Sequence, residues 1–130
     1  MSDMQTVSQL FANYAWSMDS KEFELFDEVF AESATFVVSI AGTVAASFEG
    51  RGPLVDFIRT TTLEQTDQRR HVITNVRLAG DDKATATLTL LVVDNGELIV
   101  KSCGVYSVDL VQENGELRFG AMDLALDLGF

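Results

Sequence analysis

Apolar residues recur every three or four positions near the start of the chain. This spacing is that of one face of an α-helix, so it predicts an amphipathic helix over about residues 4–18. The residues that form the stripe are Val7, Leu10, Phe11, Tyr14 and Met18.

A second helix is predicted directly afterwards, ending near Ala31. Asp19 is placed to cap it, and Glu22 follows three residues later, which is the spacing of a capping box. The apolar stripe predicted for this helix consists of Phe23, Phe26, Val29 and Phe30.

The pattern changes after Ala34, where β-branched and aromatic residues predict a strand over 34–40 and a short second strand over 44–48. Pro53 fits the first turn of a third helix, whose face is formed by Leu54, Phe57, Ile58 and Thr61. Four further strands are predicted over 70–78, 84–93, 98–111 and 117–128, with hairpin turns at Asn95-Gly96 and Asn114-Gly115. The predicted order is α-α-β-β-α-β-β-β-β, an α+β domain with the helices on one face of a mostly antiparallel sheet.

Length and composition favour one domain over residues 1–130, since 130 residues with 47% hydrophobic content suffice for a single core. Cys103 is the only cysteine, so an internal disulfide is excluded. We interpret it as a packing residue rather than a nucleophile, because Lys101 is its only basic neighbour along the strand. A reducing, cytoplasmic location is the simplest expectation.

The net charge of −11, from nine basic and twenty acidic residues, argues against a nucleic-acid partner. No apolar run approaches the ~20 residues that cross a bilayer, so no membrane association is expected. The chain also lacks a phosphate-binding loop, a dinucleotide fingerprint and metal-ligand spacing. We therefore expect neither a cofactor nor a metal.

The order of the predicted elements, together with four short segments, resembles the NTF2-like superfamily over nearly the whole chain. The local similarity is to its SnoaL-like and scytalone-dehydratase-like members. The segments are Tyr14-Ala15-Trp16-Ser17-Met18-Asp19, Phe26-Asp27-Glu28-Val29-Phe30, Glu49-Gly50-Arg51-Gly52-Pro53-Leu54 and Arg70-His71-Val72-Ile73-Thr74-Asn75. The resemblance implies a cone, in which a curved sheet wraps around the helices and leaves an apolar pocket.

The resemblance also implies a catalytic pair, in which Asp19 orients His71 as a general base or acid. Histidine is the side chain that titrates near neutrality without assistance, and a carboxylate partner fixes its tautomer. His71 is the only histidine of the chain, whereas scytalone dehydratase is expected to have a second one. In the alternative interpretation Asp19 only caps the second helix and His71 is a half-buried strand residue.

Tyr14 is the third candidate catalytic residue. In pocketed relatives, including ketosteroid isomerases, a tyrosine in this region donates a hydrogen bond to a substrate carbonyl, and a phenol can stabilise a developing oxyanion. A core tyrosine whose hydroxyl reaches the surface is the alternative. The first predicted strand contains Phe36-Val37-Val38-Ser39 and lacks the acidic base that a ketosteroid isomerase is expected to have there.

Further side chains are expected to line the pocket or to form the core beside it. We predict contact with ligand for Trp16, Phe36, Phe57, Asn75 and Tyr106. Asn75 is included because it shares the strand parity of His71. Asp123 is expected to face solvent, although it becomes a candidate acid if its side of the last strand lines the pocket.

Two functions remain open from the sequence. The first is a cofactor-free lyase or isomerase that acts on a small apolar cyclic ketone or polyketide-like molecule. The second is a non-catalytic ligand-binding or dimerisation module, because the fold commonly forms homodimers or larger homo-oligomers through its open sheet face. The apolar area predicted for that contact consists of Ala84, Ala86, Leu88 and Leu90.

Overall fold

The structure is a computed structural model, and it describes residues 3–130. Three helices and six strands follow one another along the chain. In chain order they are α1 (Met4–Asp19), the 3-10 helix η1 (Phe23–Glu28), β1 (Phe30–Ile40), β2 (Thr43–Glu49), α2 (Arg51–Glu64), β3 (Gln68–Leu78), β4 (Lys83–Asp94), β5 (Glu97–Glu113) and β6 (Glu116–Leu126). Within residues 3–130, no helix has the length and apolar character needed to span a membrane.

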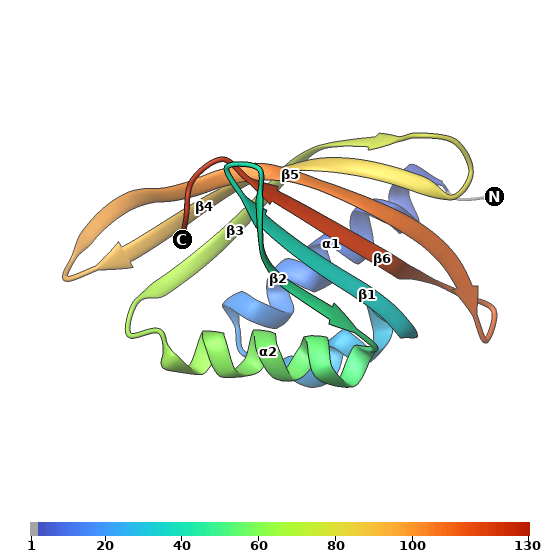
Figure 1. The fold of residues 1–130 in the computed structure, drawn as a ribbon, viewed down its shortest axis with the longest axis horizontal. Helices are drawn as coiled ribbons and strands as arrows, with labels where there is room; N and C mark the ends of the chain where they lie inside the picture. Colours follow the sequence, from blue (N-terminus) through green and yellow to red (C-terminus); the bar gives the residue numbers. More distant parts are fainter. Residues whose placement is uncertain (1–2) are drawn as a thin grey trace.

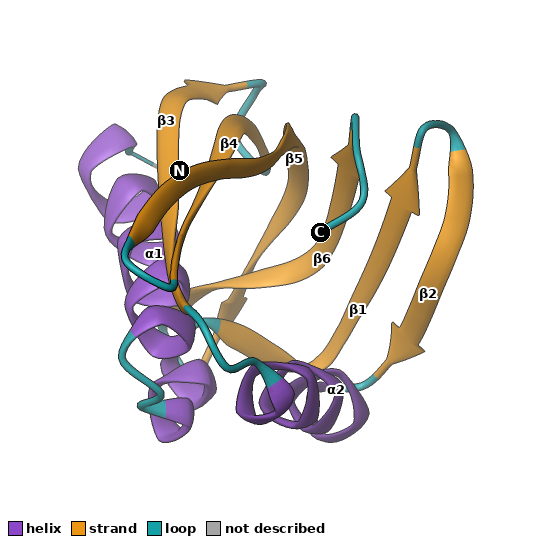
Figure 2. Ribbon diagram, turned by 90° about the vertical axis from the view of Figure 1, so that its left-hand side faces the viewer, coloured by secondary structure: helices purple, strands orange, loops and turns teal. Residues whose placement is uncertain are grey.

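The strands form one six-stranded sheet in the order β2-β1-β6-β5-β4-β3. The β1–β6 pair is parallel and every other neighbouring pair is antiparallel. The sheet curves around α1 and α2, which lie on its concave side (Figures 1 and 2). The predicted α+β cone is therefore confirmed.

Helix α1 forms as its apolar spacing predicts. The Asp3 carboxylate accepts a hydrogen bond from the Thr6 backbone N–H at 2.8 Å, which satisfies one of the unpaired donors at the helix start. The predicted stripe from Val7 to Met18 is buried. This face of the helix packs against the concave side of the sheet.

The second predicted helix is largely wrong. Only the six-residue 3-10 helix η1 forms, and its N-cap residue, Glu22, makes no side-chain capping bond. The predicted capping role of Asp19 is not observed, since its carboxylate bonds to His71 instead. Phe30 already belongs to β1 and pairs with Phe119 of β6. Backbone groups that are paired in the sheet cannot also make helical hydrogen bonds, so the helix does not extend to this residue.

The apolar residues of β4 face the interior and not an open sheet surface. Ala84, Ala86, Leu88 and Leu90 are only 1–3% exposed and contribute to the core beneath the helices. The prediction that they offer apolar area for dimerisation is therefore wrong. Side chains alternate across a strand, so the convex side of β4 carries the intervening threonines, such as Thr87.

A β-bulge changes the parity of β3 halfway along the strand. The register with β4 shifts between Thr74 and Arg77, and Asn75 lies at the bulge with a φ of +54°. Before the bulge His71 and Ile73 turn inward, and after it Val76 does. The bulge therefore decides which residues of β3 can reach the interior.

Candidate functional site

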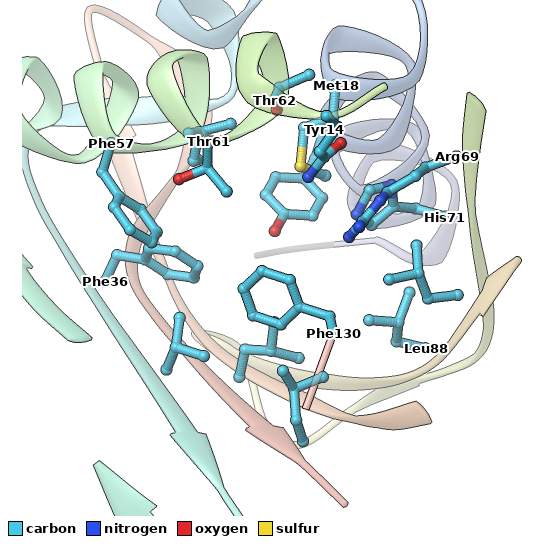
Figure 3. Close-up of a pocket in the computed structure, with 16 residues that line it drawn as sticks. Tyr14, Met18, Phe36, Phe57, Thr61, Thr62, Arg69, His71, Leu88 and Phe130 are labelled. Atoms are coloured by element: carbon cyan, nitrogen blue, oxygen red, sulfur yellow. The ribbon is translucent and has the colours of Figure 1, made fainter. Parts of the chain in front are cut away.

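A cavity lies between the helices and the concave face of the sheet. Its wall is mostly apolar and comes from α1, α2 and the four strands β1, β3, β4 and β6, with Phe130 beside them (Figure 3). The sixteen lining residues are Tyr14, Met18, Phe36, Val38, Phe57, Ile58, Thr61, Thr62, Gln65, Arg69, His71, Leu88, Leu90, Leu124, Leu126 and Phe130.

The free volume of this cavity is about 70 Å³. Pockets that enclose drug-sized ligands measure ~300–1,000 Å³. A ligand larger than a few water molecules must therefore displace a lining side chain. The Phe130 ring is 44% exposed, so it can move without opening the core.

Asp19 and His71 meet at the wall of the cavity. Asp19 is the last residue of α1 and His71 lies on β3. The distance between Asp19 Oδ1 and His71 Nδ1 is 2.6 Å, and the His71 backbone N–H donates to Asp19 Oδ2 at 2.8 Å. Both side chains are largely buried, with 15% of His71 and 10% of Asp19 exposed.

This contact determines which ring nitrogen is available for chemistry. A carboxylate only accepts hydrogen bonds, so Nδ1 carries the proton that it donates to Asp19. Within residues 3–130, Nε2 of His71 makes no hydrogen bond. Because the ring lines the cavity, Nε2 can accept or release a proton there.

Two buried tyrosines lie next to each other at the inner end of the site. The Tyr106 hydroxyl donates to the Tyr14 hydroxyl at 3.4 Å, and the rings pack edge to face with centroids 5.4 Å apart. Tyr14 lines the cavity, whereas Tyr106 lies behind it. Because the Tyr14 oxygen accepts this bond, its own proton is free to be donated into the cavity, toward which the hydroxyl points in Figure 3.

Burial raises the pKa of Tyr14 well above its ordinary value. The hydrogen bond from Tyr106 opposes this shift, and the charge of Asp19 adds to it. Tyr14 therefore keeps its proton at neutral pH.

A sequence model of the SnoaL-like domain family matches residues 1–123. The chain belongs to this family. No curated protein sequence matches this SnoaL-like domain significantly.

Solved structures with the same fold cover nearly the whole SnoaL-like domain. ActVI-ORFA from Streptomyces coelicolor has a TM-score of 0.77 at 17% identity, covering 95% of this chain and 96% of its own. A Catenulispora acidiphila protein in complex with S-DNPA has a TM-score of 0.76 at 22% identity, with 94% and 91% covered. The β subunit of a protein described as an aromatic-ring-hydroxylating dioxygenase, from Novosphingobium aromaticivorans, has a TM-score of 0.78 at 18% identity, with 97% and 90% covered.

Some of the predicted contact residues of the SnoaL-like domain lie at the cavity and others do not. Phe36 and Phe57 line it, and Tyr106 reaches it only through Tyr14. Trp16 is 56% exposed and its indole N–H donates to Glu22, so it is not a lining residue. Asn75 is exposed at the bulge of β3 and is not a lining residue either.

Several polar residues of the wall, and Phe130, were not predicted from the sequence. Arg69, Gln65, Thr62 and the terminal Phe130 line the cavity beside His71. A signal for Arg69 was present, because it precedes His71 by two residues and therefore projects from the same face of β3. No comparable signal exists for Phe130, which reaches the cavity from beyond the last strand.

Other polar candidates lie outside the cavity of the SnoaL-like domain. Asp123 is exposed, as expected for the solvent side of β6. Cys103 is exposed as well, so its interpretation as a packing residue is wrong. A hydrogen bond to Asp127 is the main cause that raises the pKa of the Cys103 thiol. Residues 3–130 contain no group of three His, Cys, Asp or Glu side chains that could hold a metal ion.

Proposed function

We propose that this SnoaL-like domain is a cofactor-free lyase or isomerase, of dehydratase or cyclase type, that acts on a small apolar cyclic ketone or polyketide-like molecule. The observation that carries the proposal is the Asp19–His71 pair at the wall of an apolar cavity. The family supports it, since SnoaL-like proteins include small-molecule-binding polyketide cyclases and dehydratases.

The proposed reaction begins with proton transfer to His71. Neutral Nε2 takes a proton from the carbon next to the substrate carbonyl, and the electron pair of that C–H bond moves to the carbonyl oxygen as an enolate. Asp19 stabilises the imidazolium through Nδ1, while Tyr14 donates a hydrogen bond to the enolate oxygen. No cofactor is needed to balance this step.

The imidazolium then returns the proton. Delivery to a different carbon of the enolate gives an isomer. Delivery to a β-hydroxyl group expels it as water and leaves a carbon–carbon double bond, which is a dehydration. Apolar neighbours such as Phe36 and Leu88 exclude water, which strengthens the hydrogen bond from Tyr14 to the developing charge.

Hydrogen exchange of a cyclic ketone tests the proposal. The rate at which the α-protons of 2-tetralone exchange in deuterated buffer can be followed by proton NMR. The protein should accelerate exchange well beyond an equal concentration of imidazole, and His71→Gln should lower the rate by about 100-fold or more. Arg70→Gln is the control, because Arg70 is the exposed neighbour on the opposite face of β3.

Wild-type exchange in the His71→Gln variant would contradict the mechanism. A fold check by circular dichroism on both variants separates a chemical loss from unfolding. Loss of exchange in Arg70→Gln as well would show that the strand, and not the imidazole, is responsible.

A non-catalytic binding or assembly module is the alternative. Two observations favour it, namely the small free volume of the cavity and the structural similarity to a dioxygenase β subunit. This alternative predicts that the wild-type protein binds 2-tetralone without accelerating exchange. It also predicts that binding survives His71→Gln.

A further inference from the structure

Arg69 brings a permanent positive charge to the wall of the cavity. It precedes His71 by two residues on β3, and only 13% of its side chain is exposed. Figure 3 shows its guanidinium group reaching toward the space beside His71 and Phe130. The guanidinium carbon lies 6.0 Å from the centre of the Phe130 ring, which is within cation–π range.

Only one edge of the Arg69 guanidinium group has a partner. Nε donates to Asp67 Oδ1 at 3.0 Å, and within residues 3–130 neither Nη atom makes a hydrogen bond. Arg51 is different, because it lies close to two carboxylates and also donates to the Phe30 carbonyl oxygen. Arg51 is therefore held by partners at both Nε and Nη1, whereas Arg69 is held at Nε alone.

Asp67 orients the Arg69 guanidinium group and leaves its Nη atoms accessible from the cavity. It is not among the lining residues, so it holds the Nε edge from outside the cavity wall. A guanidinium group fixed in this way presents its two Nη atoms in a planar fork. That fork matches the two oxygens of a carboxylate.

The charge of the cavity wall differs from that of the whole protein. The net charge of −11 repels anions at long range. None of the sixteen lining residues is Asp or Glu, and Arg69 is the one Lys or Arg among them. Asp67 balances the charge of Arg69 from outside the wall, so what the wall offers an anion is the Nη donors of a guanidinium group with no Asp or Glu side chain among the lining residues.

We propose that Arg69 is the anion-binding residue of the cavity and that its ligand is an aromatic or alicyclic carboxylic acid. The carboxylate bonds to the Nη atoms, and the apolar body lies against the wall formed by residues such as Phe36 and Phe57. This inference deepens the proposed function and rests on its small-molecule cavity. Arg69 and His71 are two residues apart on one strand, which separates their Cα atoms by roughly 7 Å. The reacting carbon of such a ligand is thus several bonds from its carboxylate.

A matched pair of fluorescent probes tests the charge requirement. The probes are 1-naphthylacetate and 1-naphthylacetamide, which share the ring system and differ in the charge of the side group. The variants are Arg69→Gln, Arg69→Lys and the control Arg70→Gln, which removes the same charge from the exposed side of β3. Dissociation constants are measured by fluorescence titration at constant ionic strength.

The wild-type protein should bind the acid at least about tenfold more tightly than the amide, which is the gain expected from a charge-assisted hydrogen bond. Arg69→Gln should abolish that preference while leaving amide binding intact, which also shows that the variant folds. Arg69→Lys should restore part of the preference, since lysine keeps the charge but lacks the planar fork. Arg70→Gln should behave as wild type.

Equal binding of acid and amide by the wild type would overturn this inference alone. The same loss of preference in Arg69→Gln and Arg70→Gln would also overturn it, because the effect would then come from overall charge. Binding of neither probe would contradict the small-molecule cavity itself, and the proposed function would fail together with the inference.

Discussion

The Asp19 carboxylate uses its two oxygens for two donors of one residue. Oδ2 accepts the backbone N–H of His71 and Oδ1 accepts the ring Nδ1–H. The backbone bond fixes the position of the carboxylate relative to β3, and the ring bond then fixes the orientation of the imidazole. A negative charge at the last residue of a helix is unfavourable for the helix dipole, so these bonds must offset that cost.

Replacing Asp19 by Asn tests whether the carboxylate sets the tautomer of His71. The amide offers one acceptor and one donor where the carboxylate offers two acceptors, so its oxygen can accept the His71 backbone N–H while its NH2 group donates to Nδ1, and both charge-assisted bonds become neutral ones. We expect the free energy of unfolding to fall by about 1–3 kcal/mol. We also expect the neutral imidazole to change from the Nδ1–H to the Nε2–H tautomer. Nitrogen-15 NMR of the ring reports this change, and the chain has only one histidine to assign.

Asp3→Asn is the control for this variant, because it makes the same chemical change at the other end of α1. Asp3 caps the helix, and Asn caps equally well, so stability should change little. A wild-type spectrum with the proton on Nε2 would contradict the assigned role of Asp19.

At the residue scale, the sequence predicted the types of group at the site better than their positions. Tyr14 and Trp16 are two positions apart on α1, which turns their side chains about 200° from each other around the helix axis. If one faces the core, the other faces solvent, so the exposure of Trp16 follows from the burial of Tyr14. Arg69 was overlooked because an arginine beside a histidine is typical of an exposed strand, and only the cavity reveals its direction.

Strand β5 is the longest element and runs above the helices as part of the curved sheet (Figure 1). Gly104 lies at the point where the backbones of β5 and β6 come close together. A Cβ atom there would overlap the carbonyl oxygen of Ala125 and lie 2.9 Å from the Leu126 Cα. Both of these are backbone atoms, so a change of rotamer cannot relieve the overlap.

Gly104→Ala should therefore destabilise the fold, by about 1–3 kcal/mol as for overpacked interiors. Gly129→Ala is the matched control, since nothing lies within 4 Å of the added Cβ atom. The control should change stability by less than about 0.5 kcal/mol. Urea unfolding followed by circular dichroism measures the stability of both variants. Equal stability would show that β5 and β6 can move apart at Gly104 without cost.

At the element scale, the sequence predicted correctly the turns whose conformation depends on residues close together in the chain. Both Asn-Gly turns join the strands they were expected to join, because a positive φ at Asn95 and Asn114 suits the hairpin. The bulge at Asn75 was missed, although asparagine tolerates the same backbone conformation there. Strict alternation placed Asn75 inside the pocket, and only the pairing with β4 shows the extra residue. The second helix failed for a similar reason, because β1 gains hydrogen bonds from β6, which is distant in sequence.

At the scale of the whole molecule, both tyrosines of the chain lie in the core and contact each other. Their contact links α1 to β5, so the burial of the two hydroxyls depends on the packing of the helix against the sheet. Burial is the main cause that raises the pKa of both Tyr14 and Tyr106. Neither hydroxyl is therefore expected to ionise while the cone is intact.

Alkaline pH should therefore destabilise the protein, and the slope of stability against pH should depend on the number of these buried hydroxyls. In the unfolded chain both ionise near pH 10. Above that pH the unfolded chain binds fewer protons than the folded protein does. The free energy of unfolding therefore falls as pH rises, by up to about 2.7 kcal/mol per pH unit for the two groups. This stability is fully present below pH 10 and is lost as the pH rises toward the pKa values of the folded state.

Absorbance at 295 nm and circular dichroism, recorded together, should show tyrosinate appearing only as the fold is lost. Tyr106→Phe removes one of the two groups, so it should reduce the slope of stability against pH by about 1.4 kcal/mol per pH unit. The lysines and Cys103 are present in both proteins, so their contributions to the slope cancel when the two slopes are compared. Tyrosinate absorbance that rises near pH 10 while the circular dichroism stays native would mean that water reaches the hydroxyl pair in the folded protein. That outcome would contradict the burial that raises the pKa of Tyr14 and Tyr106, while Tyr14 would still be neutral near pH 7.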